Sequence, residues 1–186
     1  MAQFEAGDQT HMENGVRIRD GVPDDCPGIG QLARELIRWE HAINQEIGEP
    51  TPWAGNESEI RKQMEQAGTR FIVAERDGEI VGYVKAVIHR GGSRRGIIRQ
   101  LLERLGRRPR PNFTATGGLI AGIFVSAPER GSGLGQRLSR AAEEWLRREG
   151  LSRVYIHVLQ KNDQALHFWS ESGYTPVTIV LGKSLE

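Results

Sequence analysis

The sequence predicts an α/β (α+β) domain in which helices flank a mixed β-sheet. Three observations carry this prediction. Short apolar runs typical of strands alternate with longer stretches whose apolar residues recur at helical spacing. Asp77 and Gly78 separate two apolar runs and predict a β-hairpin, because such a pair supplies the positive φ angles of a tight turn. An apolar strand then leads through a glycine-rich turn into a long amphipathic helix, at residues 118–125 and 134–150.

Length and composition place the chain among globular proteins. Its 186 residues, with 38% hydrophobic and 26% charged side chains, fit one domain with a substantial core. The net charge of +1 argues against a protein that binds polyanions over its whole surface. The single cysteine, Cys26, excludes an internal disulfide framework and a zinc site built from cysteines alone. No apolar run resembles a membrane span or a signal peptide, so we expect a cytoplasmic protein without a transmembrane segment.

The first half of the chain predicts a tail, a strand, two helices and the hairpin. Residues 1–15 are polar and are expected to form a flexible tail, which leaves a single domain at 16–186. Asn56 or Ser58 can cap the second helix. The expected strand, helices and hairpin strands fall at residues 16–19, 29–37, 56–67, 71–74 and 80–88.

The second half predicts alternating strands and helices that follow a basic insert. The strand at 118–125 is apolar throughout and is therefore expected to be buried on both faces. The helix that begins near Leu134 is expected to end at Gly150, because glycine readily adopts the left-handed conformation that closes a helix. The remaining expected elements are a strand, a short helix and a terminal pair of strands, at residues 154–159, 162–172 and 174–185.

The basic insert at about residues 90–111 concentrates positive charge. It holds eight arginines against one acid, Glu103, and its apolar residues are spaced as on a short amphipathic helix. Such a segment could contact RNA, DNA or an anionic membrane, although no aromatic residue stands among the arginines to stack on bases. The alternative is a solvated insertion. The arginines are Arg90, Arg94, Arg95, Arg99, Arg104, Arg107, Arg108 and Arg110.

The glycine-rich turn at residues 125–136 is suited to a phosphate group. Glycines let backbone N–H groups approach an anion, and the open amides at the start of the following helix favour negative charge. Arg130 adds a full positive charge. A dinucleotide fingerprint would need glycine in place of Gln136, and a Walker-type loop would need a lysine that the turn lacks. By itself the turn could also be a simple connection between a strand and a helix.

Two motifs together resemble a known family. The first is Arg130-x-x-Gly133-x-Gly135, and the second is the run at residues 162–174, which reads NDQALHFWSESGY. In this order and separation they resemble the GCN5-related N-acetyltransferases, the GNAT superfamily. The resemblance spans most of the chain and implies a central mixed, mostly antiparallel sheet flanked by helices. It also implies acetyl-CoA as co-substrate and direct transfer of its acetyl group to a primary amine of a small molecule or protein, by enzymes that often form homodimers.

The resemblance also implies which residues hold the cofactor, and it implies no metal. Backbone amides of the turn would hold the pyrophosphate of CoA, and the strand before the turn would pair with the pantetheine arm. The following strand would splay away to admit that arm. Asn162 would contact the cofactor, although it could equally be a helix cap. The expected cofactor-binding residues are Ile123, Phe124, Val125, Arg130, Gly131, Ser132, Gly133, Leu134, Gly135, Gln136, Asn162 and Phe168.

The sequence does not identify the catalytic acid and base. The family often uses a tyrosine to protonate the departing thiolate, but that position is Trp169, whose indole is not a useful proton donor. The remaining candidates are Tyr174, His157 and Glu40, and Trp39 could line a pocket for the acceptor. An acyl-CoA-binding module without catalysis is therefore the alternative to an enzyme. The sequence leaves the acceptor open.

Overall fold

The computed structural model describes residues 11–13, 15–43, 55–89, 117–177 and 179, and these residues form one sheet with helices on both faces. Six strands follow the order β1-β2-β3-β4-β5-β6 across the sheet, and every neighbouring pair is antiparallel except β5 and β6, which are parallel. The strands are β1 His11–Glu13, β2 Val16–Asp20, β3 Thr69–Arg76, β4 Glu79–His89, β5 Gly117–Val125 and β6 Val154–Ile156.

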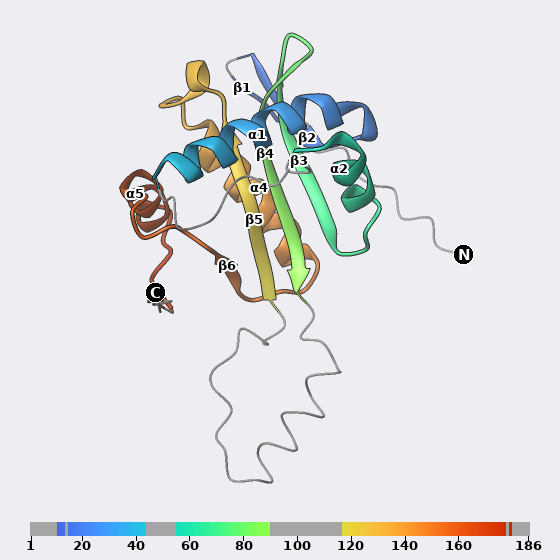
Figure 1. Cartoon of the computed structure of the whole chain (residues 1–186). Helices are drawn as coiled ribbons and strands as arrows, with labels where there is room; N and C mark the ends of the chain where they lie inside the picture. The colour runs from blue at the N-terminus through green and yellow to red at the C-terminus, as the bar shows by residue number, and fades with distance from the viewer. Residues whose placement is uncertain (1–10, 14, 44–54, 90–116, 178, 180–186) are drawn as a thin grey trace, which may run out of the picture.

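The helices divide between the two faces of this sheet (Figure 1). α1 (Cys26–Ile43) and α2 (Glu57–Met64) cover one face, and α4 (Leu134–Arg148) covers the other. α5 (Asp163–Glu171) lies beside the start of α4. Two short 3-10 turns, η1 (Pro23–Asp25) and η3 (Ala127–Glu129), precede α1 and α4. The predicted fold class, a mostly antiparallel sheet flanked by helices, is confirmed.

The sheet separates two hydrophobic clusters. One lies between the sheet and α4 and includes Ile120 and Leu138, while the other lies between the sheet and α1 and includes Ile29 and Phe71. All four side chains are at most 4% exposed. Among the described helices, none is both long enough and apolar enough to span a lipid bilayer.

A β-bulge in β5 decides which face its side chains meet. Lys85 of β4 pairs with Gly122, whereas the next residue of β4 pairs with Ile120, so Ala121 is an extra residue in β5. Residues four apart in a regular strand share a face, but here Ile120 packs on the α4 side and Phe124 packs on the α1 side. The bulge therefore turns Gly122 and Phe124 toward α1.

The predicted hairpin turn and the predicted cap of the second helix are both confirmed. Asp77 and Gly78 have φ angles of 51° and 84° and close the β3–β4 hairpin. Asn56 is the N-cap of α2, since its side chain accepts a hydrogen bond from the backbone N–H of Ser58 at 2.9 Å.

Four predictions need correction or fall partly or wholly outside the described residues. β1 falls inside the expected tail, because backbone pairing with β2 requires no apolar pattern. The strand expected at 154–159 ends at Ile156, where its pairing with β5 stops. Of the expected terminal strand pair, residues 174–177 and 179 are not in a strand, and the other positions lie outside the described residues. The whole basic insert, at 90–111, also lies outside them.

Candidate functional site

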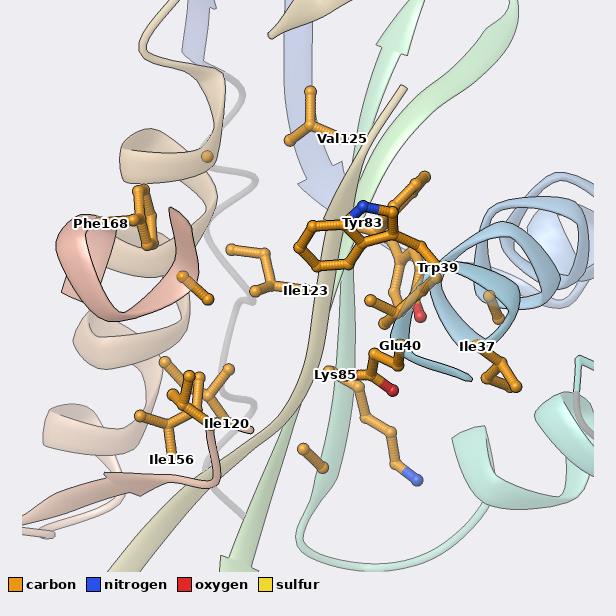
Figure 2. Close-up of a pocket in the computed structure, with 18 of the residues that line it drawn as sticks. Ile37, Trp39, Glu40, Tyr83, Lys85, Ile120, Ile123, Val125, Ile156 and Phe168 are labelled. Carbon is orange, nitrogen blue, oxygen red and sulfur yellow. The ribbon is translucent and has the colours of Figure 1, made fainter. Parts of the chain in front are cut away.

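A cavity of about 1000 Å³ runs from the α1 side of the sheet to the glycine-rich turn. Figure 2 shows its two halves, with Trp39, Glu40 and Lys85 on one side of β5 and Ile156 and Phe168 on the other. The first half is formed by α1, α2 and β4, and the second by β5, the turn, β6 and α5. Both halves meet at the middle of β5.

The second half exists because β5 and β6 separate. Their pairing covers only three residues of each strand, ending at Ile120 and Ile156, while β5 continues to Val125. Among the described strands none pairs with this edge of β5 beyond Ile120. An extended ligand can therefore bind along residues 121–125 as an added strand would.

The glycine turn offers open backbone amides at the start of α4. Gly131 and Gly133 have φ angles of 77° and 79°, and the positions of their missing Cβ atoms face open space. Gly133 is the N-cap of α4, so no side chain caps the helix, and its first turn carries no acidic residue. The unsatisfied amides and the positive end of the helix dipole suit an anion such as a pyrophosphate.

Arg130 and Ser132 take part in holding the shape of this turn. The Arg130 Nε donates a hydrogen bond to the carbonyl oxygen of Val125 at 3.1 Å, and its guanidinium lies 5.0 Å from the centre of the Phe124 ring. Ser132 Oγ donates to the carbonyl oxygen of Glu129 at 2.6 Å. Arg130 therefore stays beside the cavity with its charge available to an anion.

The structure brings the predicted cofactor-binding residues together with one exception. All of them line the cavity except Ser132, whose hydroxyl is engaged within the turn. Asn162 is 6% exposed and is the N-cap of α5, since its Oδ1 accepts from the N–H of Ala165 at 2.9 Å. Phe168 lies against Gly135, where a Cβ would come within 3.4 Å of its ring. Their part in binding a cofactor stays a prediction.

Glu40 reaches the other half of the cavity from the last turns of α1. Among the interactions of the described residues, its half-buried carboxylate has no hydrogen bond and no ion pair. Burial alone raises the pKa of this carboxyl. A carboxylate left without a partner in a cavity is a ready counter-ion for a positively charged ligand.

Tyr83 was not predicted from the sequence and lies beside Glu40. Its side chain is 5% exposed, and the structure records no hydrogen bond for its hydroxyl within the described part of the chain. Burial, and then the charge of Glu40, raise the pKa of this phenol, which keeps it protonated. The hydroxyl lies 3.6 Å from the place of a Gly122 Cβ, at the junction of the two halves. The apolar pattern of 80–88 gave no signal for it.

Lys85 lies further along the wall formed by β4 and α2. Its Nζ donates to Gln63 Oε1 at 2.7 Å, and Gln63 Nε2 donates to Glu59 Oε1 at 3.0 Å. Burial lowers the pKa of Lys85, and the charge of Glu59 opposes that shift. Unlike Glu40, these charges already have partners. Within the described ranges, no three His, Cys, Asp or Glu side chains are grouped as metal ligands.

Residues 34–174 match the model of the acetyltransferase (GNAT) family. The chain belongs to this family of acetyltransferases. The predicted resemblance is thereby confirmed.

Similar proteins agree with this assignment. The uncharacterized N-acetyltransferase YobR of Bacillus subtilis (strain 168) is 31% identical over 61 residues, which are 33% of this chain and only a quarter of that protein. The solved structure of a mutant of the BH1408 protein from Bacillus halodurans has a TM-score of 0.74 at 15% identity, covering 91% of this chain and 99% of that one. The aminoglycoside N-acetyltransferase AAC(6')-Iy, solved in complex with CoA, has a TM-score of 0.66 at 14% identity, covering 97% and 98%. At these identities the structures show the fold alone.

The GNAT chain departs from the family pattern at Trp169, which is 4% exposed. Its ring packs edge-on against Phe168 and Tyr174, both at 4.8 Å between ring centres. The Tyr174 hydroxyl donates to Glu143 Oε1 at 2.9 Å, and Tyr174 does not line the cavity. His157 lines the cavity as an exposed residue. Of the three catalytic candidates, Glu40 alone combines a place in the cavity with a side chain that has no hydrogen bond or ion pair to the described residues.

Proposed function

We propose that this chain transfers the acetyl group of acetyl-CoA directly to a primary amine in a ternary complex. The observation that supports it is the shape of the cavity, which joins an open turn suited to an anion to a chamber holding two polar groups that have no hydrogen-bond partner among the described residues. These groups are the Glu40 carboxylate and the Tyr83 hydroxyl. The turn suits a cofactor phosphate, and the chamber suits an amine.

The residues of the second half fit CoA. Amides of residues 130–136 would hold the pyrophosphate, and the free edge of β5 at Ile123 to Val125 would bind the pantetheine arm. Phe168 would pack against the cofactor, as Asn162 would while capping α5. Bound acetyl-CoA supplies a thioester whose carbon–sulfur bond is replaced by a carbon–nitrogen bond, which gives the amide and the CoA thiol.

The residues of the first half would bind the amine and move its proton. The Glu40 carboxylate accepts a hydrogen bond from the ammonium and receives its proton directly or through water, which its raised pKa favours. Tyr83 stays protonated, so its hydroxyl donates a hydrogen bond to the oxygen on which negative charge develops. Trp169 supplies no proton and packs the cavity wall.

Thermal unfolding with acetyl-CoA, CoA and NAD tests the cofactor part of this function. Ligand at about 100 times its dissociation constant adds about 2.7 kcal/mol of stability. We expect both CoA forms, and not NAD, to raise Tm. No shift with either CoA form would contradict the proposal. A shift with no turnover of any amine would favour the module without catalysis.

Two glycines at opposite ends of α4 offer a matched pair of variants. Gly133 and Gly150 have φ angles of 79° and 82°, and both face open space, so alanine strains the backbone equally at each, by about 1 kcal/mol. We expect Gly133→Ala to lose most of the shift caused by CoA and Gly150→Ala to keep it. Equal shifts in the two variants would mean that the turn does not hold CoA.

The finer sequence-based expectations remain predictions. They are the cytoplasmic location, a homodimer, and contact of the basic insert with nucleic acid or an anionic membrane.

A further inference from the structure

We infer that the acceptor is a primary amine with a single positive charge on an apolar body, such as an alkylamine or an arylalkylamine. This inference rests on the proposed function and concerns the half of the cavity formed by α1, α2 and β4. Two observations support it: the side chains that form this half are largely apolar and buried, and Glu40 is the one charged group there that has no partner among the described residues.

Apolar side chains form most of the wall of this half. Ile29, Phe71 and Phe124 are between 0% and 8% exposed and belong to the hydrophobic cluster on this face. Ile37 and Trp39 of α1 are half-buried and line the same space. Burying an apolar ligand against such a wall is favourable by about 25 cal/mol for each Å² removed from water.

The charges of this half leave room for one cation. Glu59 and Lys85 both bond to Gln63 and offset each other, whereas the Glu40 carboxylate has no partner among the described residues. His41 also lines this half and has a partner of its own. The described groups therefore offer one carboxylate to a ligand.

A second ammonium on the acceptor would be poorly placed. Among the described residues of this half it would find no carboxylate besides Glu40 and Glu59, whose charge Lys85 already offsets, and it would be repelled by Lys85. Lys85 is held in the wall because its Nζ is fixed by Gln63 and lies 5.7 Å from the centre of the Phe71 ring. The cavity thus selects against diamines, polyamines and aminoglycosides by charge.

The test compares amines that differ by one charge. Release of CoA thiol is measured with hexylamine and 1,6-diaminohexane, then with phenethylamine, spermidine and kanamycin. We expect kcat/KM for hexylamine to exceed that for 1,6-diaminohexane by about tenfold or more, the scale of one unmatched charge, although the diamine offers two amines. Binding is measured independently as the rise in Tm that each amine adds in the presence of CoA.

Variants at Lys85 test whether its charge causes the preference for the monoamine over the diamine. Lys85→Met removes the charge at similar length and should narrow the hexylamine-to-diamine ratio about threefold or more, while Lys85→Arg should preserve it. Lys62→Met makes the same change of charge on the exposed side of α2, outside this cavity, and should leave the ratio unchanged. The rise of Tm caused by CoA shows that each variant is folded.

The outcomes separate this inference from the proposed function. Equal or faster turnover of the diamine, spermidine or kanamycin overturns the inference and leaves acetyl transfer standing. A CoA-induced rise in Tm without binding or turnover of any monoamine also overturns it, as does an equal loss of selectivity in Lys85→Met and Lys85→Arg. If CoA did not raise Tm and no amine were acetylated, the proposed function itself would be wrong, and the inference that rests on it would fall as well.

Discussion

The two ends of α1 carry carboxyl groups in opposite situations. Asp25 lies directly before the helix, and its carboxylate accepts hydrogen bonds from both Arg19 Nη atoms at 2.6 and 2.8 Å and from the Val22 N–H at 2.8 Å. Burial acts to raise the pKa of Asp25, but the bonds from Arg19 and Val22 outweigh it and hold the pKa below its usual value. Glu40, near the other end, has no such partner in the part of the chain that the structure describes, and burial raises its pKa.

The difference teaches which charges serve the fold and which are kept for a ligand. Removing one partner of a buried charge pair destabilises the fold because the other charge is left uncompensated, whereas a buried charge without partners costs stability until a ligand supplies them. Proteins tolerate such a cost at functional sites. Each variant below changes one side of this comparison.

The largest expected effect is on stability at the satisfied end. Asp25→Ala leaves the Arg19 guanidinium, 18% exposed, with one carboxylate partner, Glu75, and the carbonyl oxygen of Asp20 among the described residues, so we expect a loss of about 3 kcal/mol in unfolding free energy. Thermal unfolding should show Tm lower by about 5–10 °C. Asp24→Ala is the control, since Asp24 is exposed and adjacent, and should change Tm little. An equal fall of Tm in both variants would contradict a stabilising role of the ion pair between Asp25 and Arg19.

The next effect is on activity at the unsatisfied end. Glu40→Gln removes the counter-ion for the amine and the group that accepts its proton, so kcat/KM should fall about 30- to 100-fold, or roughly 2–2.7 kcal/mol. Its Tm should not fall, and CoA should still raise it. Glu35→Gln, on the same helix and outside the cavity, should keep full activity. If Glu40→Gln were as active as the wild type, Glu40 would not be the group that binds the ammonium of the acceptor.

Tyr83 and Tyr174 allow the same comparison for hydroxyl groups, since Tyr174 has a hydrogen-bond partner and Tyr83 has none among the described residues. Tyr83→Phe removes a hydroxyl that has no hydrogen bond to the described residues and should lower kcat about tenfold, the scale of one hydrogen bond, with KM and stability unchanged. Tyr174→Phe removes the bond to Glu143 and should instead cost about 1 kcal/mol of stability with kcat unchanged. If Tyr83→Phe lost stability and kept kcat, its hydroxyl would have a structural role.

The sequence predicted the features that depend on local chemistry. The positive φ angles at Asp77, Gly131 and Gly133 are properties of a turn and its glycines, so the hairpin and the open start of α4 could be found by inspection. The nearness of Glu40 to Tyr83 could not be found in this way, because it requires α1 to pack on β4. The place of Tyr83 beside Gly122 also depends on the bulge in β5, and no local pattern encodes either feature.

The smallest effect is the pH dependence of stability, and it has opposite signs at the two ends of α1. The folded pKa of Asp25 is lowered, so its stabilisation is full above the unfolded value of about 3.9 and is lost as pH falls through the folded pKa. The folded pKa of Glu40 is raised, so its charge destabilises the fold at neutral pH, and protonation relieves this as pH falls toward the unfolded value of about 4.3.

At pH 7, therefore, Asp25→Ala should have a lower Tm than the wild type, and Glu40→Gln a slightly higher one. The gain in unfolding free energy of Glu40→Gln should be less than about 1 kcal/mol, because Glu40 is only half-buried. The difference in stability between each variant and the wild type should shrink as the pH falls. For Glu40→Gln it should begin to shrink at a higher pH than for Asp25→Ala, because the pKa of Glu40 is raised and that of Asp25 is lowered. Tyr83, Lys85 and His41 also face this cavity, and comparing each variant with the wild type at the same pH cancels the contributions that both proteins share. A Glu40→Gln difference that is negative, or constant down to pH 4, would mean that the carboxylate has a partner in the folded protein, and the amine would then have to displace that partner to bind.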